Sequence, residues 1–248
     1  MKPGQFRWVI CGLLFLATTV NYMDRQILGI LAPTLQREIG WTEKEYGYIV
    51  TAFQAAYALG LLGVGRAIDL IGTGRGYSLS VIFWSLAAMA HAAVRSPFGF
   101  GVVRFALGLG EAGNFPAAIK TIAEWCPKKE RALATGLFNA GSNVGAIVTP
   151  IAVPFITLHY GWRWAYLLTG IVGFLWVVLW HWTYRLPQEH PRVTAAELAH
   201  IQSDPAEPAT HVPWLSLLTA KETIGLLVAR FMTDGVWWFY LFWTPAYL

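Results

Sequence analysis

Seven long apolar stretches constrain the fold of this chain more than any other feature of its sequence. They cover approximately residues 8–31, 46–66, 76–94, 98–122, 132–156, 163–184 and 223–247. A helix that crosses the roughly 30 Å hydrocarbon core of a bilayer needs roughly 20 mostly apolar residues. The sequence therefore predicts an all-α membrane protein with seven spans.

The composition indicates that the chain is surrounded by lipid rather than by water. Of the 248 residues, 56% are hydrophobic and only 13% are charged, whereas a soluble domain of this size rarely has so few charges for its surface. The formal net charge of +4 does not indicate a nucleic-acid partner, because the basic residues form short clusters between apolar stretches and no continuous face. The expected surroundings are the lipid bilayer.

The connections divide the chain into three parts. The first six stretches are joined by short segments, so residues 1–185 are predicted to form a six-helix N-terminal transmembrane bundle of antiparallel neighbours. Residues 186–222 contain five prolines and several charges, which predicts a cytoplasmic linker with one short helix near 194–202. Residues 223–248 hold the seventh helix. Thr42, followed by Glu43 and Glu45, marks the start of the second helix.

Lysine and arginine predict the orientation in the membrane. Eleven of them fall at the N-terminus and in alternate connections, namely Lys2, Arg7, Arg66, Arg75, Lys120, Lys128, Lys129, Arg131, Arg185, Arg192 and Lys221. The opposite side holds four, namely Arg37, Lys44, Arg95 and Arg163. Because basic residues are enriched in cytoplasmic loops, we expect a multi-pass protein of the inner (plasma) membrane with a cytoplasmic N-terminus. Trp and Tyr near the span ends are predicted to be interfacial anchors.

Charged side chains inside the spans are the strongest functional signal. Asp24 and Arg25 lie in the first span, and Arg104 and Glu111 lie seven residues apart in the fourth, on one helical face. A charge within the bilayer costs at least about 2.5–3.5 kcal/mol on insertion scales, so it needs a partner or an aqueous cavity. Structural ion pairs are the alternative, but two acids and two arginines at similar depth are costly to keep for packing alone. We expect them to line a central cavity.

Other polar residues recur at helical spacing near the middle of the spans. They are Tyr22, Gln54, Tyr57, Asn114, Asn139, Ser142, Asn143, Arg230 and Asp234. A single Asn or Ser in a membrane helix is more often explained by a hydrogen bond between helices. A cavity-lining role is therefore predicted for these residues only together with the four charged ones.

The residue types indicate transport of a small organic anion. A guanidinium fork matches the two oxygens of a carboxylate, which suits Arg25 and Arg104 to an anionic substrate. The protonation of a carboxyl group responds to burial and to nearby charge, which suits Asp24 and Glu111 to proton coupling. The sequence contains no P-loop, no Gly-x-Ser-x-Gly and no Cys/His cluster, so we predict no enzyme, no cofactor and no metal site.

The two cysteines are not expected to form a disulfide. Cys11 lies within the first predicted helix and Cys126 lies at the cytoplasmic end of the fourth, far away in sequence. Disulfides are also rare in a reducing compartment.

Residues 65–75, between the second and third spans, read Gly-Arg-Ala-Ile-Asp-Leu-Ile-Gly-Thr-Gly-Arg. This segment resembles the signature loop of the major facilitator superfamily, Gly-x-x-x-Asp-x-x-Gly followed by basic residues. The resemblance implies a conformational latch made of Gly65, Asp69, Gly72 and Arg75. In the family the Asp caps and charge-pairs at a neighbouring helix end in the outward-open state. Leu70 and Gly74 depart from the usual basic pattern, so a weaker latch is expected.

Four further segments carry a more specific likeness. They are residues 21–25 (Asn-Tyr-Met-Asp-Arg), 104–116 (Arg-Phe through Glu-Ala-Gly-Asn-Phe-Pro), 161–165 (Gly-Trp-Arg-Trp-Ala) and 234–240 (Asp-Gly-Val-Trp-Trp-Phe-Tyr). They resemble the anion:cation symporter branch of the superfamily, and within it the hexuronate transporters. The resemblance covers essentially the whole chain and implies proton-coupled import of a sugar acid such as galacturonate or glucuronate.

The resemblance also implies residue roles. Asp24 and Glu111 would take up protons, and Arg25 and Arg104, with Tyr57, would surround the substrate carboxylate. With the other polar candidates, the predicted substrate-binding set is Arg25, Arg104, Tyr57, Tyr22, Asn114, Ser142, Asn143 and Trp238.

A transporter of this superfamily has twelve helices in two bundles, with its substrate between them. The resemblance therefore implies a six-helix N-terminal bundle of the major facilitator fold plus helix seven of an incomplete C-terminal bundle, with a complementary C-terminal bundle as partner. A fragment of an ordinary transporter is favoured over a truncated gene or a protein assembled from two halves. Another organic anion, such as an aldarate or an aromatic or acyl carboxylate, is the alternative substrate. A non-transporting membrane protein is the alternative class.

Overall fold

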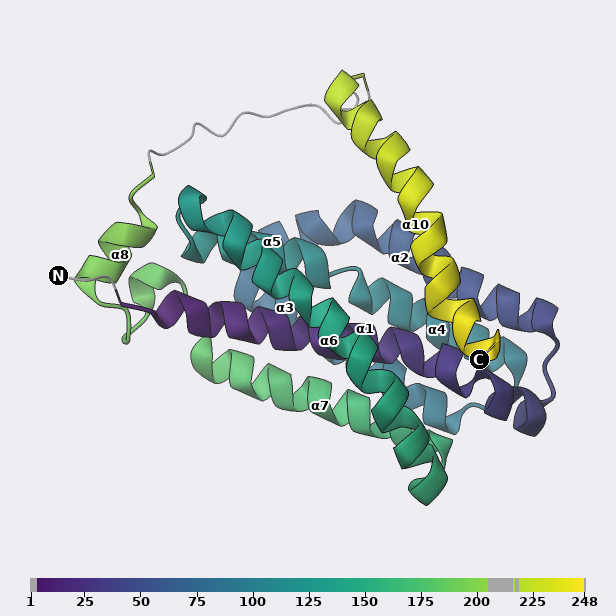
Figure 1. The fold of residues 1–248 in the computed structure, drawn as a ribbon. Coiled ribbons are helices and arrows are strands. Elements are labelled where there is room, and N and C mark those ends of the chain that lie inside the picture. The colour runs from purple at the N-terminus through teal and green to yellow at the C-terminus, as the bar shows by residue number, and fades with distance from the viewer. Residues whose placement is uncertain (1–3, 205–215, 217–218, 248) are drawn as a thin grey trace. The chain divides into compact units, whose positions relative to one another are not determined.

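The computed structural model describes residues 4–204, 216 and 219–247, and within these ranges the chain forms helices and no strand (Figure 1). The prediction of an all-α protein is confirmed. The chain forms two compact units, Met1–Asp204 and Pro205–Leu248. The first unit includes residues 186–204, which the sequence assigns to the linker.

The first unit is built mainly from seven helices. They are α1 (Phe6–Ile39), α2 (Glu43–Ile71), α3 (Thr73–Ala90), α4 (Pro97–Glu111), α5 (Asn114–Trp125), α6 (Lys128–Tyr160) and α7 (Trp162–Thr183). It also contains the short segments η1 (His91–Ala93), η2 (Pro187–Glu189) and α8 (Ala195–Ile201). In the second unit the structure describes α10 (Lys221–Tyr247).

Five of the described helices are long and apolar enough to cross a membrane, namely α1, α2, α3 with η1, α6 and α7. The predicted fourth span, 98–122, is not one continuous helix. It is interrupted at residues 112–113, so that α4 ends at Glu111 and α5 begins at Asn114. At the break the chain packs closely on α3: a Cβ atom added to Gly113 would lie 2.7 Å from Ser80 Cβ. α10, which covers the predicted seventh span, is not among the five.

The ends of the helices follow local signals. Thr42 Oγ1 accepts a hydrogen bond from the Glu45 backbone N–H (3.2 Å), and the Glu45 carboxylate accepts one from the Thr42 N–H (2.8 Å). This reciprocal capping box confirms the predicted start of α2. Gly72 has φ +89° and joins α2 to α3 without any further residue, a conformation that favours glycine.

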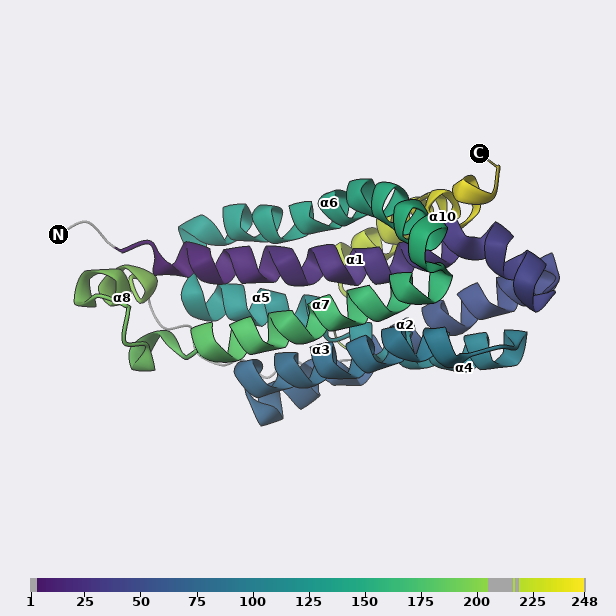
Figure 2. The same ribbon diagram turned by 90° about the horizontal axis from the view of Figure 1, so that it is seen from below.

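α1 lies at the centre of the unit, between α6 and α7 (Figures 1 and 2). α2 packs on α4, and α3 packs on both α4 and α7. Close approach of α6 to α1 depends on Gly141 and Gly145, where an added Cβ would lie 2.4 Å from the Phe15 carbonyl oxygen and 2.7 Å from the Thr19 carbonyl oxygen. Small residues at such contacts let membrane helices pack closely.

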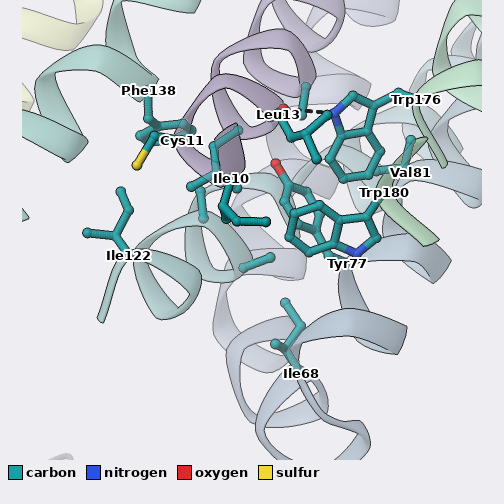
Figure 3. Packing of buried hydrophobic residues seen from close by; sticks show 14 of the residues in the cluster. Ile10, Cys11, Leu13, Ile68, Tyr77, Val81, Ile122, Phe138, Trp176 and Trp180 are labelled. Atoms are coloured by element: carbon teal, nitrogen blue, oxygen red, sulfur yellow. Dashed lines mark hydrogen bonds between the residues drawn. The ribbon is translucent and has the colours of Figure 1, made fainter. Parts of the chain in front are cut away.

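An aromatic cluster ties α7 to α3 and α1 (Figure 3). The ring centroid of Trp176 lies 4.8 Å from that of Tyr77 and 5.0 Å from that of Trp180. Trp176 Nε1 donates a hydrogen bond to the Leu13 carbonyl oxygen at 2.7 Å. All three side chains are buried in the bundle, so Tyr77 and Trp180, which lie near the ends of predicted spans, are packed in the interior instead of serving as interfacial anchors.

The first half of the predicted linker is fastened to the bundle. Its short helix, α8, lies within the predicted range of 194–202. Glu197 on α8 accepts a hydrogen bond from the Arg7 backbone N–H at 3.1 Å. Arg7 Nε and His200 Nε2 contact the carboxylate of Glu130 on α6 at 2.7 and 2.9 Å. This segment therefore packs as part of the first unit.

Candidate functional site

The four charged residues from the predicted spans meet inside the first unit. Arg25 Nε on α1 lies 2.6 Å from Glu111 Oε2 at the end of α4. Arg104 on α4 donates hydrogen bonds to the backbone oxygens of Asp24 (3.3 Å) and Arg25 (3.0 Å). These contacts join the middle of α1 to α4.

Asp24 differs from Glu111 in its surroundings. Its side chain is buried, and neither carboxylate oxygen forms a hydrogen bond of standard geometry with the described residues, although the Thr169 hydroxyl lies close enough to interact with it. Arg104 bonds to the Asp24 backbone oxygen rather than to the carboxylate. An ionised carboxylate that is buried without donors is costly, and protonation removes that cost. Asp24 is therefore chemically suited to carry a proton.

Aromatic rings enclose the two arginines. Arg25 Cζ lies 4.5 Å from the ring centroid of Tyr57 and 4.9 Å from that of Tyr22. The ring of Phe53 lies 5.4 Å from Arg25 Cζ and 5.0 Å from Arg104 Cζ, so it contacts both cations. Such cation–π contacts hold a guanidinium in place. Phe53 was not predicted from the sequence, although it lies one helical turn before Tyr57.

The charged residues lie in the interior of the unit rather than on the wall of an open cavity. Arg104 and Glu111 are 0% exposed, and the half-buried Tyr22 and Tyr57 lie beside Arg25. The four charged side chains are therefore buried within the first unit, and their place beside a central cavity stays a prediction. A groove of about 510 Å³ between α2 and α4 is lined by other residues, among them Tyr48 and Phe98.

The remaining predicted binding residues have varied surroundings. Asn114 Oδ1 accepts a hydrogen bond from Tyr77 Oη at 2.6 Å, and its Nδ2 donates to Thr18 Oγ1 at 3.2 Å, so it ties α5 to α3 and α1. Ser142 Oγ donates to the carbonyl oxygen of Asn139 in its own helix at 2.7 Å. Asn143 is exposed on α6. Trp238 lies on α10 in the second unit.

The latch residues lie where α2 meets α3. Asp69 accepts a hydrogen bond from Lys120 Nζ on α5 at 2.6 Å, and Gly72 makes the junction described above. Gly65 is half-buried on α2, and Arg75 is exposed on α3. The charge partner of Asp69 is thus Lys120, about fifty residues along the chain, which motif spacing could not reveal.

Other charged groups have identifiable roles in packing. Arg230 Nε lies 3.4 Å from Asp234 Oδ2, one turn along α10. Glu38 at the end of α1 contacts Trp162 Nε1 (2.6 Å) and Arg163 Nη2 (3.2 Å) at the start of α7. Among the described residues there is no group of three or more His, Cys, Asp or Glu side chains that could hold a metal ion.

Comparison with known proteins identifies the family. Residues 14–248 match the model of the Major Facilitator Superfamily. The chain is 30% identical to a galacturonate transporter of Dickeya chrysanthemi, with 100% of this chain and 73% of the relative covered. It is 32% identical to a probable galactarate/D-glucarate transporter of Bacillus subtilis (strain 168), of which it spans 58%. These relatives are transporters and not enzymes.

A solved structure shows the same fold. A bacterial homologue of the human lysosomal transporter Spinster, in an inward-facing and unoccupied conformation, matches 87% of this chain and 48% of its own length with a TM-score of 0.66. Its sequence identity is 21%, so the likeness concerns the fold alone. The family model, the curated relatives and the helical architecture agree: this multi-pass membrane protein belongs to the Major Facilitator Superfamily.

Proposed function

We propose that this chain forms the N-terminal part of a proton-coupled importer of a sugar acid, a hexuronate such as galacturonate, in the inner membrane. The buried contact between Arg25 and Glu111, with Asp24 beside it, is the observation that carries the proposal. The similarity to a galacturonate transporter supports the choice of substrate.

The mechanism that fits this geometry is an exchange of partners at Arg25. When Glu111 takes up a proton it loses its charge, and Arg25 becomes able to pair with a substrate carboxylate instead. The half-buried rings of Tyr22 and Tyr57, both within 5 Å of Arg25 Cζ, mark the side from which the substrate approaches. Loss of the proton restores the Arg25–Glu111 pair and expels the anion.

Other residues complete the proposed cycle. Asp24 serves as a second proton carrier, and Arg104 holds the α1 backbone next to it. Asn114, Ser142, Asn143 and Trp238 are proposed to contact the rest of the substrate. Gly65, Asp69, Gly72 and Arg75, with Lys120, form the conformational latch. The distribution of lysine and arginine supports a cytoplasmic N-terminus, and a complementary C-terminal bundle would supply the opposite wall of the site.

An aldarate, which carries a carboxylate at each end, is the second candidate substrate. The 32% identity to a probable galactarate/D-glucarate transporter favours it. Two arginines within contact of the same Phe53 ring could serve two carboxylates as well as one.

Uptake into proteoliposomes separates these proposals. Radiolabelled galacturonate or galactarate is supplied to vesicles that hold the complete gene product, with excess unlabelled galacturonate, glucuronate, galactarate, galactonate or phthalate as competitor. We expect uptake that galacturonate and glucuronate inhibit most strongly and that Arg25→Met abolishes. Stronger inhibition by galactarate would favour the aldarate. Absence of uptake of every acid would contradict the transporter proposal and favour a non-transporting protein. The same uptake assay with the 248-residue chain alone shows whether transport needs a second bundle.

A further inference from the structure

Two buried thiols lie close together at the junction between α5 and α6. The Sγ atoms of Cys11 and Cys126 lie 4.0 Å apart, and each residue is 1% exposed. Both thiols are free, and they are the two cysteines of the sequence. The sequence did not predict this contact, because the two cysteines lie far apart along the chain. It forms because α1 passes directly beside the end of α5.

The surroundings of the pair are mainly apolar, with charged groups of both signs (Arg7, Glu130 and Arg131) nearby. Cys11 packs in the buried cluster that includes Ile122 and Phe138 (Figure 3). Arg131 Nε donates a hydrogen bond to the Cys126 carbonyl oxygen at 3.1 Å. The contact with the Cys11 thiol lowers the pKa of the Cys126 thiol below its ordinary value, which favours its thiolate form.

We propose that Cys11 and Cys126 are a reversible oxidation site that a small oxidant converts to an intramolecular disulfide. An S–S bond is about 2.05 Å long, so the two sulfur atoms must approach by about 2 Å. Cys126 lies in the short connection between α5 and α6, outside either helix. The bond therefore requires side-chain rotation at both cysteines and a small adjustment of this connection.

The oxidation is chemically balanced with a peroxide as oxidant. The Cys126 thiolate attacks the O–O bond of hydrogen peroxide, which forms a sulfenic acid and releases hydroxide that takes up the thiol proton as water. The Cys11 sulfur then attacks the Cys126 sulfur, the S–S bond forms, the S–O bond breaks, and a second water leaves with the Cys11 proton. Two thiols are oxidised by two electrons and one peroxide is reduced to two waters. A thiol reductant reverses the bond.

The location of the cysteine pair fits a regulatory disulfide. Under the orientation proposed above, the pair lies toward the cytoplasm, where thiols are kept reduced and disulfides are usually transient or redox-sensing. Both cysteines belong to the first unit, so the bond would fasten α1 to the α5–α6 junction within one bundle. This inference goes beyond the proposed transport activity and does not depend on it.

Thiol counting on the 248-residue chain in native membranes tests the proposal. Membranes are reduced, exposed to diamide, denatured and treated with a maleimide, and the chain is analysed by intact mass. Diamide accepts the same two electrons and two protons in becoming a hydrazine. We expect two maleimide labels before oxidation and none after it, with a mass lower by two hydrogen atoms and full recovery on reduction. The Cys126→Ser variant, which retains Cys11 alone, should carry one maleimide label both before and after diamide.

A relocated cysteine provides the matched control. Gly12 is adjacent to Cys11, and a Cβ added there would meet nothing within 4 Å, so Cys11→Ala with Gly12→Cys places a thiol on a different face of α1. We expect this variant to keep both labels after diamide. Two labels on the oxidised wild-type chain, a reductant-sensitive dimer, or equal oxidation of the relocated variant would each overturn the proposal.

Discussion

At the residue scale, the contact between Arg25 and Glu111 is the central feature of the proposed site, and both side chains are at most 1% exposed. Glu111→Ala would leave the guanidinium buried without this carboxylate, and breaking a buried pair costs about 3–5 kcal/mol. We expect a clear fall in the unfolding temperature of the detergent-solubilised chain. Replacing both residues with methionine should restore part of the loss, because no buried charge is then left over.

An exposed ion pair serves as the control for this prediction. Arg163 and Glu38 lie 3.2 Å apart with side chains 44% and 45% exposed, and such pairs contribute about 0–1 kcal/mol. Arg163→Met should therefore change the unfolding temperature little. If Glu111→Ala proved as harmless as Arg163→Met, the buried pair would not hold α1 to α4.

The sequence identified the charged residues within the spans, but it did not identify the residues that contact them. The charged residues stand out in the sequence because an apolar span makes each of them costly. Their neighbours depend on the three-dimensional arrangement, so Phe53 between two arginines, Lys120 beside Asp69 and Cys126 beside Cys11 were all missed. A pattern along one helix carries no information about which helix lies beside it.

At the scale of elements, the packing of α6 on α1 depends on glycines whose Cβ atoms have no room. Gly141→Ala would place a methyl group 2.4 Å from the Phe15 carbonyl oxygen and force the two helices apart, at a cost of about 1–3 kcal/mol. Gly136, on the same helix, has nothing within 4 Å of an added Cβ. Gly136→Ala should be neutral or stabilise by up to about 1 kcal/mol. Thermal unfolding of the two variants provides the comparison, and equal effects would contradict the close contact.

The segment 186–204 is predicted to loosen in acid. His190 packs on Phe6 with ring centroids 4.2 Å apart, and its Nδ1 accepts a hydrogen bond from the Arg192 backbone N–H at 3.1 Å. Burial lowers the pKa of His190 below its ordinary value of 6.5. The folded segment therefore keeps the ring neutral, whereas the unfolded segment takes up a proton. The stabilisation is present above about pH 6.5 and is lost as the pH falls below it.

Hydrogen exchange of residues 186–204 measures this effect, with rates corrected for the intrinsic dependence on pH. We expect protection to fall between about pH 7.5 and about pH 5.5. His190→Gln should reduce the difference while leaving the contact between His200 and Glu130 in place. Protection that is independent of pH in the wild-type chain would contradict the role of His190.

The positions of the helices were largely predictable, because a span needs a run of apolar residues whatever its neighbours are. The predicted span 98–122 missed the break between Glu111 and Asn114, although Gly113 and Pro116 lie beside it and a proline has no N–H to donate to the preceding turn. Trp180 lies near a span end, where an interfacial anchor is expected, but its indole group packs inside the bundle against Trp176.

At the scale of the whole molecule, composition and span length sufficed for the fold class, and the family followed from motifs that the comparisons confirm. The compact unit extends to Asp204, past the predicted boundary at residue 185, because Glu197 binds Arg7 and His200 binds Glu130, which polar composition cannot show. Polar residues that contact a folded unit have the same composition as a free linker.

Substrate-driven proton entry is the most direct test of the central claim that the buried acids and arginines couple protons to a sugar acid. Galacturonate is added to weakly buffered proteoliposomes that hold the complete gene product, and the external pH is recorded together with uptake. We predict that the medium becomes alkaline in step with uptake, that Glu111→Gln loses both signals, and that Arg163→Met keeps both. Uptake that proceeds without proton movement and persists in Glu111→Gln would contradict the account.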